Sequence, residues 1–141
     1  MQRAVYHAPQ PVATIPIEGS RPTSDGAYRA GEPFFVGVLP PRDGYLYCYL
    51  LDDRQHVSQF YPAQTPTRLS GGTLTVLNAE SPLVASRGGH RQQVACFSSP
   101  KDLGHQPLEP STIVGLEGLK TRFAIAVSGA YAMGVLDVKV Q

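Results

Sequence analysis

The clearest strand signal in the chain is Tyr45-Leu-Tyr-Cys-Tyr-Leu-Leu51, in which aromatic and smaller apolar side chains alternate. Successive side chains of a strand point to opposite faces, so the tyrosines share one face and the residues between them share the other. The two sets are Tyr45, Tyr47 and Tyr49, and Leu46, Cys48 and Leu50. The polar Asp52-Asp-Arg-Gln55 follows as a turn, and 57–61 returns as a strand that Pro62 ends. The stretch therefore predicts an antiparallel hairpin.

Further strands are predicted on both sides of this hairpin, each bounded by turn residues. They cover 12–17, 34–39, 73–77, 92–98, 123–127 and 130–140, the last two as a strand pair or as one bent strand. Only 111–121 predicts a helix, with Ser111 as its N-cap and Leu116 and Leu119 at helical spacing. Gly115 and Gly118 each weaken that helix by about 1 kcal/mol relative to alanine. Seven or eight short strands and one short helix near the C-terminus predict a mainly β fold, an antiparallel β-sandwich or open barrel.

The composition is that of one domain. The chain has 141 residues, within the usual size of a single domain, and it shows no internal repeat and no linker. Its 14 glycines and 13 prolines interrupt many short elements, which is uncommon in helical bundles. We therefore expect 1–141 to be a single β-sandwich-like domain, either independent or excised from a larger protein.

Charge and hydropathy argue against two classes of partner. The 12 basic and 11 acidic residues give a net charge of +1 without a basic run, so the sequence predicts no nucleic-acid binding. Proline, glycine or a charge interrupts every apolar run, so we expect no direct membrane insertion. The N-terminal residues lack the apolar core of a signal peptide. The chain is then either cytoplasmic or an internal piece of a longer protein exported to the periplasm or cell envelope.

Cys48 and Cys96 lie far apart in apolar, strand-like runs and have no zinc-ligand spacing. We interpret them first as buried thiols that pack as small apolar side chains. The alternative is a disulfide between two strands, which would require an oxidising compartment. No two of the histidines have a metal-ligand spacing, so the sequence predicts no metal and no cofactor. The histidines are His7, His56, His90 and His105.

Two groups of residues are candidates for binding a ligand or partner. The face with Tyr45, Tyr47 and Tyr49 would suit a peptide, a glycan or a protein if it were exposed. For a central strand we favour burial of that face, with the aliphatic face packed on a second sheet. The cationic loop from Arg87 to Arg91 has the groups to hold an anion, but it lacks the elements of a phosphate loop. We favour a hairpin connection there.

No residue is assigned a catalytic role. The set Ser98, His90 and Asp43 contains the residue types of a hydrolase triad. A β domain with many serines allows such sets by chance, and no nucleophile elbow is present. A small hydrolase or transferase on a β scaffold therefore stands as an alternative only.

Several short motifs follow one another in a definite order. They are Tyr28 with Gly31-Glu32, Gly44-Tyr-Leu-Tyr47, Asp52-Asp53, Phe60-Tyr-Pro62, Gly71-Gly72 and Val94-Ala-Cys-Phe-Ser98. With this order, over roughly 12–103 and more loosely from Arg122 to the end, the chain resembles the bacterial module called domain of unknown function 4384. It differs at Arg54-Gln55-His56, where that family has a glycine at the hairpin tip.

The resemblance implies a module rather than a particular reaction, because the family has no established activity. Its members often form the C-terminal part of larger bacterial proteins, including membrane-tethered kinases and envelope proteins. We therefore expect a non-enzymatic binding, sensory or docking module that recognises a protein partner or a small ligand. A structural domain that forms homo-oligomers through its edge strands is the remaining alternative.

Overall fold

The structure is a computed structural model, which describes residues 10–20, 27–85 and 91–140. Over these residues the protein is mainly β, with several sheets, no closed barrel and one helix near the C-terminus, which confirms the predicted fold class. The described strands number eleven rather than seven or eight, because the predicted runs 12–17 and 34–39 are each divided in two and two short strands, at 27–28 and 83–84, were not predicted. No helix among these residues is long and apolar enough to cross a membrane.

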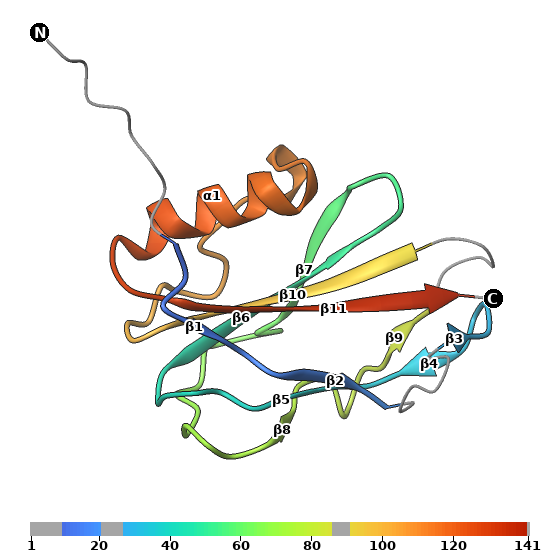
Figure 1. Cartoon of the computed structure of the whole chain (residues 1–141), viewed down its shortest axis with the longest axis horizontal. Coiled ribbons are helices and arrows are strands. Elements are labelled where there is room, and N and C mark those ends of the chain that lie inside the picture. Colours follow the sequence, from blue (N-terminus) through green and yellow to red (C-terminus); the bar gives the residue numbers. More distant parts are fainter. Residues whose placement is uncertain (1–9, 21–26, 86–90, 141) are drawn as a thin grey trace, which may run out of the picture.

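A central sheet forms the middle layer of the molecule (Figure 1). Its strands are β1 (Ala13–Thr14), β3 (Ala27–Tyr28), β6 (Tyr45–Leu51), β7 (Val57–Tyr61), β10 (Arg91–Ser99) and β11 (Ala132–Val140). The order is β1-β11-β10-β6-β7, and β3 also pairs with β11. The predicted hairpin is confirmed, since β6 pairs antiparallel with β7, and β10 pairs antiparallel with β6 and β11.

The prediction of a wholly antiparallel fold is wrong at one edge, where β1 and β3 run parallel to β11. Neighbouring strands in the sequence can be joined by a tight hairpin and then run antiparallel. β1 and β3 lie at the other end of the sequence from β11, so no hairpin constrains their direction.

Two small sheets cover one face of the central sheet, and the helix covers the other (Figure 1). The first comprises β2 (Ile17–Gly19), β5 (Val36–Val38) and β8 (Thr75–Val76), and the second comprises β4 (Pro33–Phe34) and β9 (Leu83–Val84). The predicted strand 12–17 is divided because the chain leaves the central sheet after β1 and joins the small sheet at β2. This change of sheet makes the fold a sandwich with an added helical layer.

Alternation along β6 divides the interior into two cores. Leu46 and Cys48 lie in a core between the central and small sheets, together with Val36 and Val38 of β5. Tyr47 and Tyr49 lie in a second core, beneath the helix. The sheet is therefore buried on both faces near β6, which is why this strand is apolar throughout.

The helix α1 spans Gly115–Val127, so the predicted helix is confirmed in existence but not in its bounds. Ser111 does not cap it, because Ser111 lies in a short 3-10 turn, Pro110–Thr112, and the N-cap residue is Val114. The strand predicted at 123–127 is wrong, since these residues are the last turns of α1. Leu119, Phe123 and Val127 recur at intervals of four and are all buried, which is a helical rather than a strand pattern.

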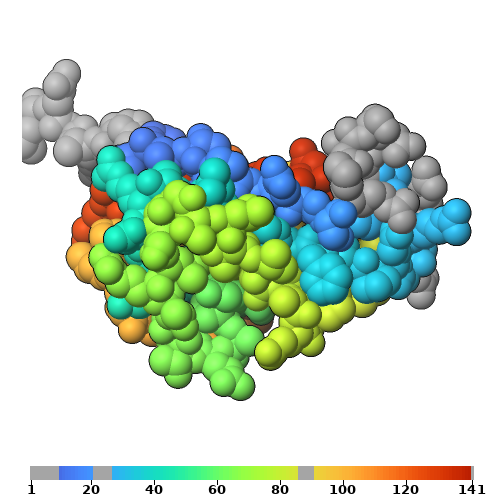
Figure 2. Space-filling view, turned by 90° about the horizontal axis from the view of Figure 1, so that it is seen from below, coloured from blue at the N-terminus to red at the C-terminus, as the bar shows by residue number. Residues whose placement is uncertain are grey.

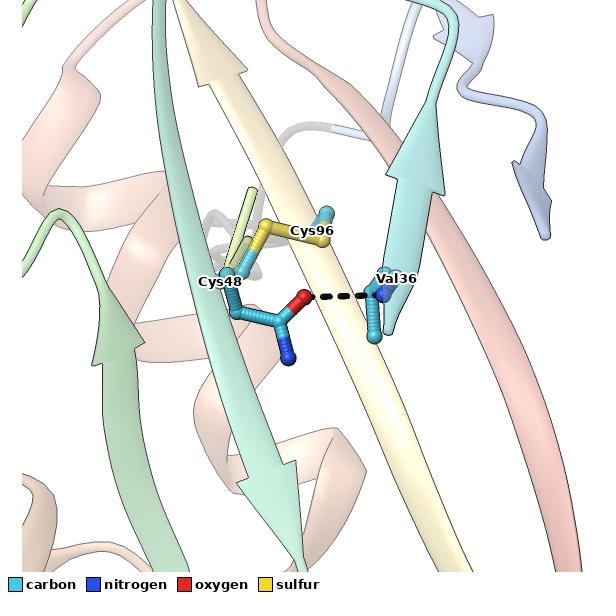
Figure 3. The surroundings of a disulfide bond; sticks show 4 residues. Val36, Cys48 and Cys96 are labelled. Carbon is cyan, nitrogen blue, oxygen red and sulfur yellow. Dashed lines mark hydrogen bonds between the residues drawn. A yellow bond between two sulfur atoms is a disulfide. The ribbon is translucent and has the colours of Figure 1, made fainter. Parts of the chain in front are cut away.

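Cys48 and Cys96 are direct partners across β6 and β10, and a disulfide joins them (Figure 3). The preferred interpretation as two free thiols is therefore wrong, although both residues are fully buried as expected. The apolar runs around Cys48 and Cys96 predicted that both side chains are buried. They did not predict the register that places the two residues opposite each other. In the same layer, the buried Asn78 amide accepts a hydrogen bond from the Val36 N–H at 2.9 Å and donates one to the Phe34 carbonyl at 3.1 Å.

Candidate functional site

The tyrosine face of β6 is a structural core and not a binding surface. Tyr47 and Tyr49 are both 0% exposed, and Tyr45 is half-buried against the same core. The ring of Tyr47 lies 5.8 Å from that of Phe123 in α1. The favoured expectation of burial is thus confirmed, and the assignment of Tyr47 and Tyr49 to an exposed ligand-binding stripe is wrong. The tyrosines face inward because α1 covers this part of the sheet.

The two buried hydroxyl groups differ in their partners. Tyr47 Oη accepts a hydrogen bond from the Leu103 N–H at 2.7 Å, whereas Tyr49 Oη is buried without a partner among the described residues. Burial raises the pKa of both phenols, and in Tyr47 the hydrogen bond from Leu103 partly offsets this. Both side chains are therefore neutral over the physiological range and contribute to packing.

The other predicted site residues do not converge. Arg91 is exposed at the start of β10, opposite Lys139 of β11, while Arg87 lies outside the described residues. His7 and His90 lie outside them too, so the set of Ser98, His90 and Asp43 is not described as a whole. Within the described residues, no group of three His, Cys, Asp or Glu side chains could hold a metal ion.

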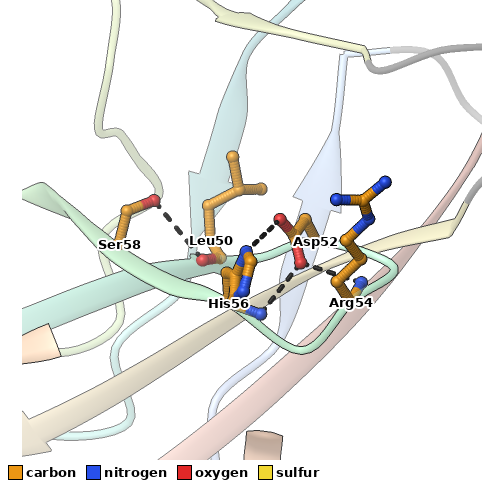
Figure 4. Close-up of polar contacts among 5 residues, drawn as sticks. All are labelled: Leu50, Asp52, Arg54, His56 and Ser58. Carbon is orange, nitrogen blue, oxygen red and sulfur yellow. Dashed lines mark hydrogen bonds and ion pairs between the residues drawn. The ribbon is translucent and has the colours of Figure 1, made fainter. Parts of the chain in front are cut away.

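The hairpin that presents β7 is organised by Asp52 (Figure 4). Its carboxylate oxygen Oδ1 accepts hydrogen bonds from the N–H groups of Arg54 at 2.9 Å and His56 at 2.8 Å, and Oδ2 lies 3.3 Å from His56 Nδ1. Partial burial raises the pKa of the Asp52 carboxyl, but the hydrogen bonds outweigh this, and the pKa is lower than usual. Gln55, at the tip, has a φ of 66°, in the left-handed region that favours glycine.

β7 is the edge strand of the central sheet over the described residues. The Asp52 N–H donates to the His56 carbonyl at 3.1 Å, so this pair is hydrogen-bonded. Because such pairs alternate along an antiparallel ladder, the backbone of Ser58 also faces β6, and the N–H and C=O groups of Val57 and Gln59 face away from it. Beyond β7, His56 forms an isolated antiparallel bridge with Val114, and the Gly115 N–H donates to the Gln55 carbonyl at 3.0 Å. The segment before α1 therefore covers the N-terminal end of this edge, and β7 presents the backbone groups of Gln59 outward.

A groove runs beside β7 on the side of the helix, and we call it the helix-side groove. Its volume is about 480 Å³. It is lined by Val57, Ser58, Gln59, Pro62, Ala63, His105, Gln106, Glu109, Pro110 and Ser111. One wall of the groove is β7 and the other is the segment 105–111. The Gln59 side-chain amide of β7 donates hydrogen bonds to the carbonyl oxygens of His105 at 2.7 Å and Pro62 at 3.3 Å. The second wall is therefore held at a set distance from β7.

A second groove lies beside β7 on the opposite face, and we call it the sheet-side groove. Its volume is about 540 Å³. It is lined by Phe60, Ala63, Val76, Leu77, Asn78, Ala79, Glu80, Ser81, Pro82 and Leu83. Figure 2 shows this face, with a hollow between the chain near Ala63 in green and the chain near Glu80 in yellow-green. Ala63 lines both grooves, so they meet at the C-terminal end of β7.

The grooves combine segments that the sequence does not suggest belong together. His105, Glu109 and Ser111 have the residue types of a hydrolase, but no hydrogen bond joins their side chains in the described part of the chain. The helix-side groove therefore provides hydrogen-bonding groups beside the edge strand β7. Strand 57–61 was predicted. The wall at 105–111 was predicted as irregular chain leading to the helix N-cap Ser111, and the wall at 76–83 as the end of strand 73–77 followed by a loop.

Comparisons of the chain with protein-family models, with curated proteins and with solved structures find no match. The resemblance to domain of unknown function 4384 therefore stays a prediction.

Proposed function

We propose that this protein is a non-enzymatic binding module that takes up an extended segment of a partner protein as an added strand beside β7. The observation that supports it is the C-terminal half of the β7 edge, beyond the bridge of His56 with Val114, where the backbone groups of Gln59 point outward between two grooves. Main-chain hydrogen bonds to an exposed sheet edge provide affinity for any extended chain, and pockets on the two faces provide selectivity.

The spacing of strands explains how both grooves would be used at once. An added strand would lie about 4.8 Å from β7, with its side chains alternating between the two faces of the sheet. One side chain would enter the helix-side groove, and the next would enter the sheet-side groove.

The disulfide supports a place for this module outside the reducing cytosol. Structural disulfides persist in oxidising compartments such as the bacterial periplasm and are rare in the cytosol. With the family resemblance, this favours a docking or sensory module of a larger, envelope-associated bacterial protein. Both the compartment and the parent protein are proposals.

A capped octapeptide of alternating valine and threonine provides the test, because it is neutral and forms strands. Its binding is followed by fluorescence anisotropy, and its place by the backbone amide NMR shifts of Val57–Tyr61. We expect Gln59→Pro to abolish binding, because proline removes the outward N–H without removing a hydrogen bond to β6.

The matched control is Gln59→Ala, which loses the same side-chain bonds to His105 and Pro62 but keeps the N–H. It should bind the octapeptide within a few-fold of the wild type. Equal binding by the proline variant, or shifts confined to other strands, would contradict strand addition at β7.

A further inference from the structure

We infer that the segment taken up beside β7 is the C-terminal tail of another protein, which pairs antiparallel with β7 and ends beside Val114. This inference rests on the proposed strand addition and specifies its ligand. It comes from the short length of edge that the chain leaves open, because the segment before α1 lies beside the N-terminal end of β7.

The segment before α1 closes that end of the edge. Val114 forms an antiparallel bridge with His56, the residue before β7, and the Gly115 N–H donates to the Gln55 carbonyl at 3.0 Å. The backbone of Val114 therefore occupies the position next to His56 that an added strand would need. Ile113 is buried in the core beneath α1 and holds this segment in place.

The open part of the edge favours an antiparallel partner. Beyond the bridge, Gln59 has its backbone N–H and C=O groups facing outward. In an antiparallel pair, one partner residue exchanges both hydrogen bonds with the residue opposite, whereas in a parallel pair the two bonds go to different residues of the partner. One residue of an antiparallel strand therefore satisfies both groups of Gln59. Antiparallel pairing is also slightly more stable per residue.

An antiparallel strand runs against the direction of β7, so its C-terminal end approaches Val114. After the residue opposite Gln59, the next two would lie opposite Ser58 and Val57. A third would lie opposite His56, where Val114 already is. A chain that ends there fits without a bend, whereas an internal segment would have to turn out of the sheet.

The other end of the edge leaves room for the rest of the partner. Ala63 lines both grooves, which meet at the C-terminal end of β7. The chain that precedes the bound tail can leave there, where Figure 2 shows a hollow beside the segment in green. Strand β11 of a second copy does not supply such a tail, because Lys139 and Val140 are paired with β10 and β3.

Three peptides with the same octapeptide core, valine alternating with threonine, test the inference. One is the capped core alone, one has four prolines before the core, and one has four prolines after it. Proline runs are stiff and cannot join the edge, so every register of the third peptide places chain beyond Val57. By fluorescence anisotropy, we expect the first two to bind within about two-fold of each other and the third about tenfold or more weakly.

A nitroxide spin label gives the direction of the bound core. On its last residue, the label should broaden the amide NMR signal of Val114 more than that of Ala63, and on its first residue the reverse should hold. Both effects should disappear in Gln59→Pro. If the label on the first residue broadens Val114 more, the strand is parallel, and the inferred C-terminal tail is wrong.

Further outcomes separate this inference from strand addition itself. Equal binding of the two extended peptides, each lost in Gln59→Pro, would overturn recognition of a chain end while leaving strand addition intact. If none of the peptides binds, both fail. If sedimentation shows wild-type dimers that Gln59→Pro dissociates, the edge serves a second copy, and the inferred partner is wrong.

Discussion

Tyr47 and Tyr49 stand two residues apart on the same face of β6, yet only Tyr47 has a hydrogen bond to its hydroxyl group. The Leu103 N–H donates to Tyr47 Oη at 2.7 Å, and Tyr49 Oη has no partner among the described residues. Both side chains are completely buried. A buried hydroxyl group stabilises a fold only when it is paired, so the two hydroxyl groups have opposite effects on stability although both rings pack in the core.

Removal of each hydroxyl group should therefore change stability in opposite directions. Tyr47→Phe leaves the Leu103 N–H without its acceptor and should lower the free energy of unfolding by about 1 kcal/mol. Tyr49→Phe removes an unpaired polar group and should leave stability equal or raise it by up to about 1 kcal/mol. Urea denaturation of both variants at neutral pH measures the difference. A loss of equal size in both would show that Tyr49 Oη has a partner.

Stability should also fall at alkaline pH. Burial raises the pKa values of Tyr47, Tyr49, Tyr61 and Tyr131 above the ordinary 10.0. The folded state then keeps protons that the unfolded state loses, so stability is fully present below pH 10.0 and decreases as the pH rises further. Denaturation as a function of pH measures the slope. The slope should be smaller in Tyr49→Phe, and an unchanged slope would contradict this assignment.

The disulfide should make a large contribution to stability because it closes a long loop. Cys48 and Cys96 are 48 residues apart, and a cross-link over such a distance stabilises a fold by about 2–4 kcal/mol. The double variant Cys48→Ala/Cys96→Ala should lose that amount in urea denaturation. Wild-type protein refolded in reductant is the control, since it keeps both sulfur atoms. A double variant as stable as the wild type would show that the bridge is not structural.

The same bridge should resist reduction while the protein is folded. Both cysteines are 0% exposed, so reductant and an alkylating reagent cannot reach them without unfolding. Mass spectrometry of protein from its natural host should show no alkylation under native conditions, and two labelled thiols after reduction in denaturant. Labelling of both thiols in denaturant without reductant would show that they are free, and would remove the support for an oxidising compartment.

Two glycine-to-alanine changes should have opposite effects. A Cβ on Gly134 of β11 would overlap the carbonyl oxygen of Ile15, where the chain passes from β1 to β2. Gly134→Ala should therefore lower the free energy of unfolding by about 1–3 kcal/mol. Gly118→Ala is the matched control, because it lies in α1 and its Cβ would meet only Ile113, at 3.6 Å. Gly118→Ala should raise the free energy of unfolding by up to about 1 kcal/mol. A Gly134→Ala variant as stable as the wild type would contradict the close approach of Ile15 to β11.

Acid should loosen the hairpin that presents β7. The hydrogen bonds from His56 and Arg54 lower the pKa of Asp52 below the ordinary 3.8, so its stabilising effect is present above that pH and is lost as the pH falls through the lowered value. Asp52→Ala should cost about 1 kcal/mol at neutral pH and speed hydrogen exchange at the His56 N–H. Asp52→Asn keeps an acceptor and should cost less. Hydrogen exchange that is unchanged in both variants would show that Asp52 does not stabilise the hairpin.

Local patterns in the sequence predicted a good part of the fold. The alternation from Tyr45 to Leu51, followed by a polar turn and Pro62, predicted the β6–β7 hairpin and the two faces of β6. The burial of Cys48 and Cys96 followed from their apolar runs. The strand predicted at 123–127 failed because short apolar runs fit a strand and a helix equally well, and the contact with the sheet selected the helix.

The candidate site could not be predicted in the same way, because its walls come from distant parts of the chain. Nothing near Gln59 in the sequence indicates that its amide will bond to the His105 carbonyl. The disulfide needed the register that places Cys48 opposite Cys96, and the burial of Tyr47 needed α1 above it. Side-chain periodicity depends on neighbours a few residues apart and can be seen in one sequence. The register of two strands, the burial of β6 beneath α1 and the shape of the two grooves depend on contacts between segments far apart in the sequence. Those contacts exist only once the chain is folded.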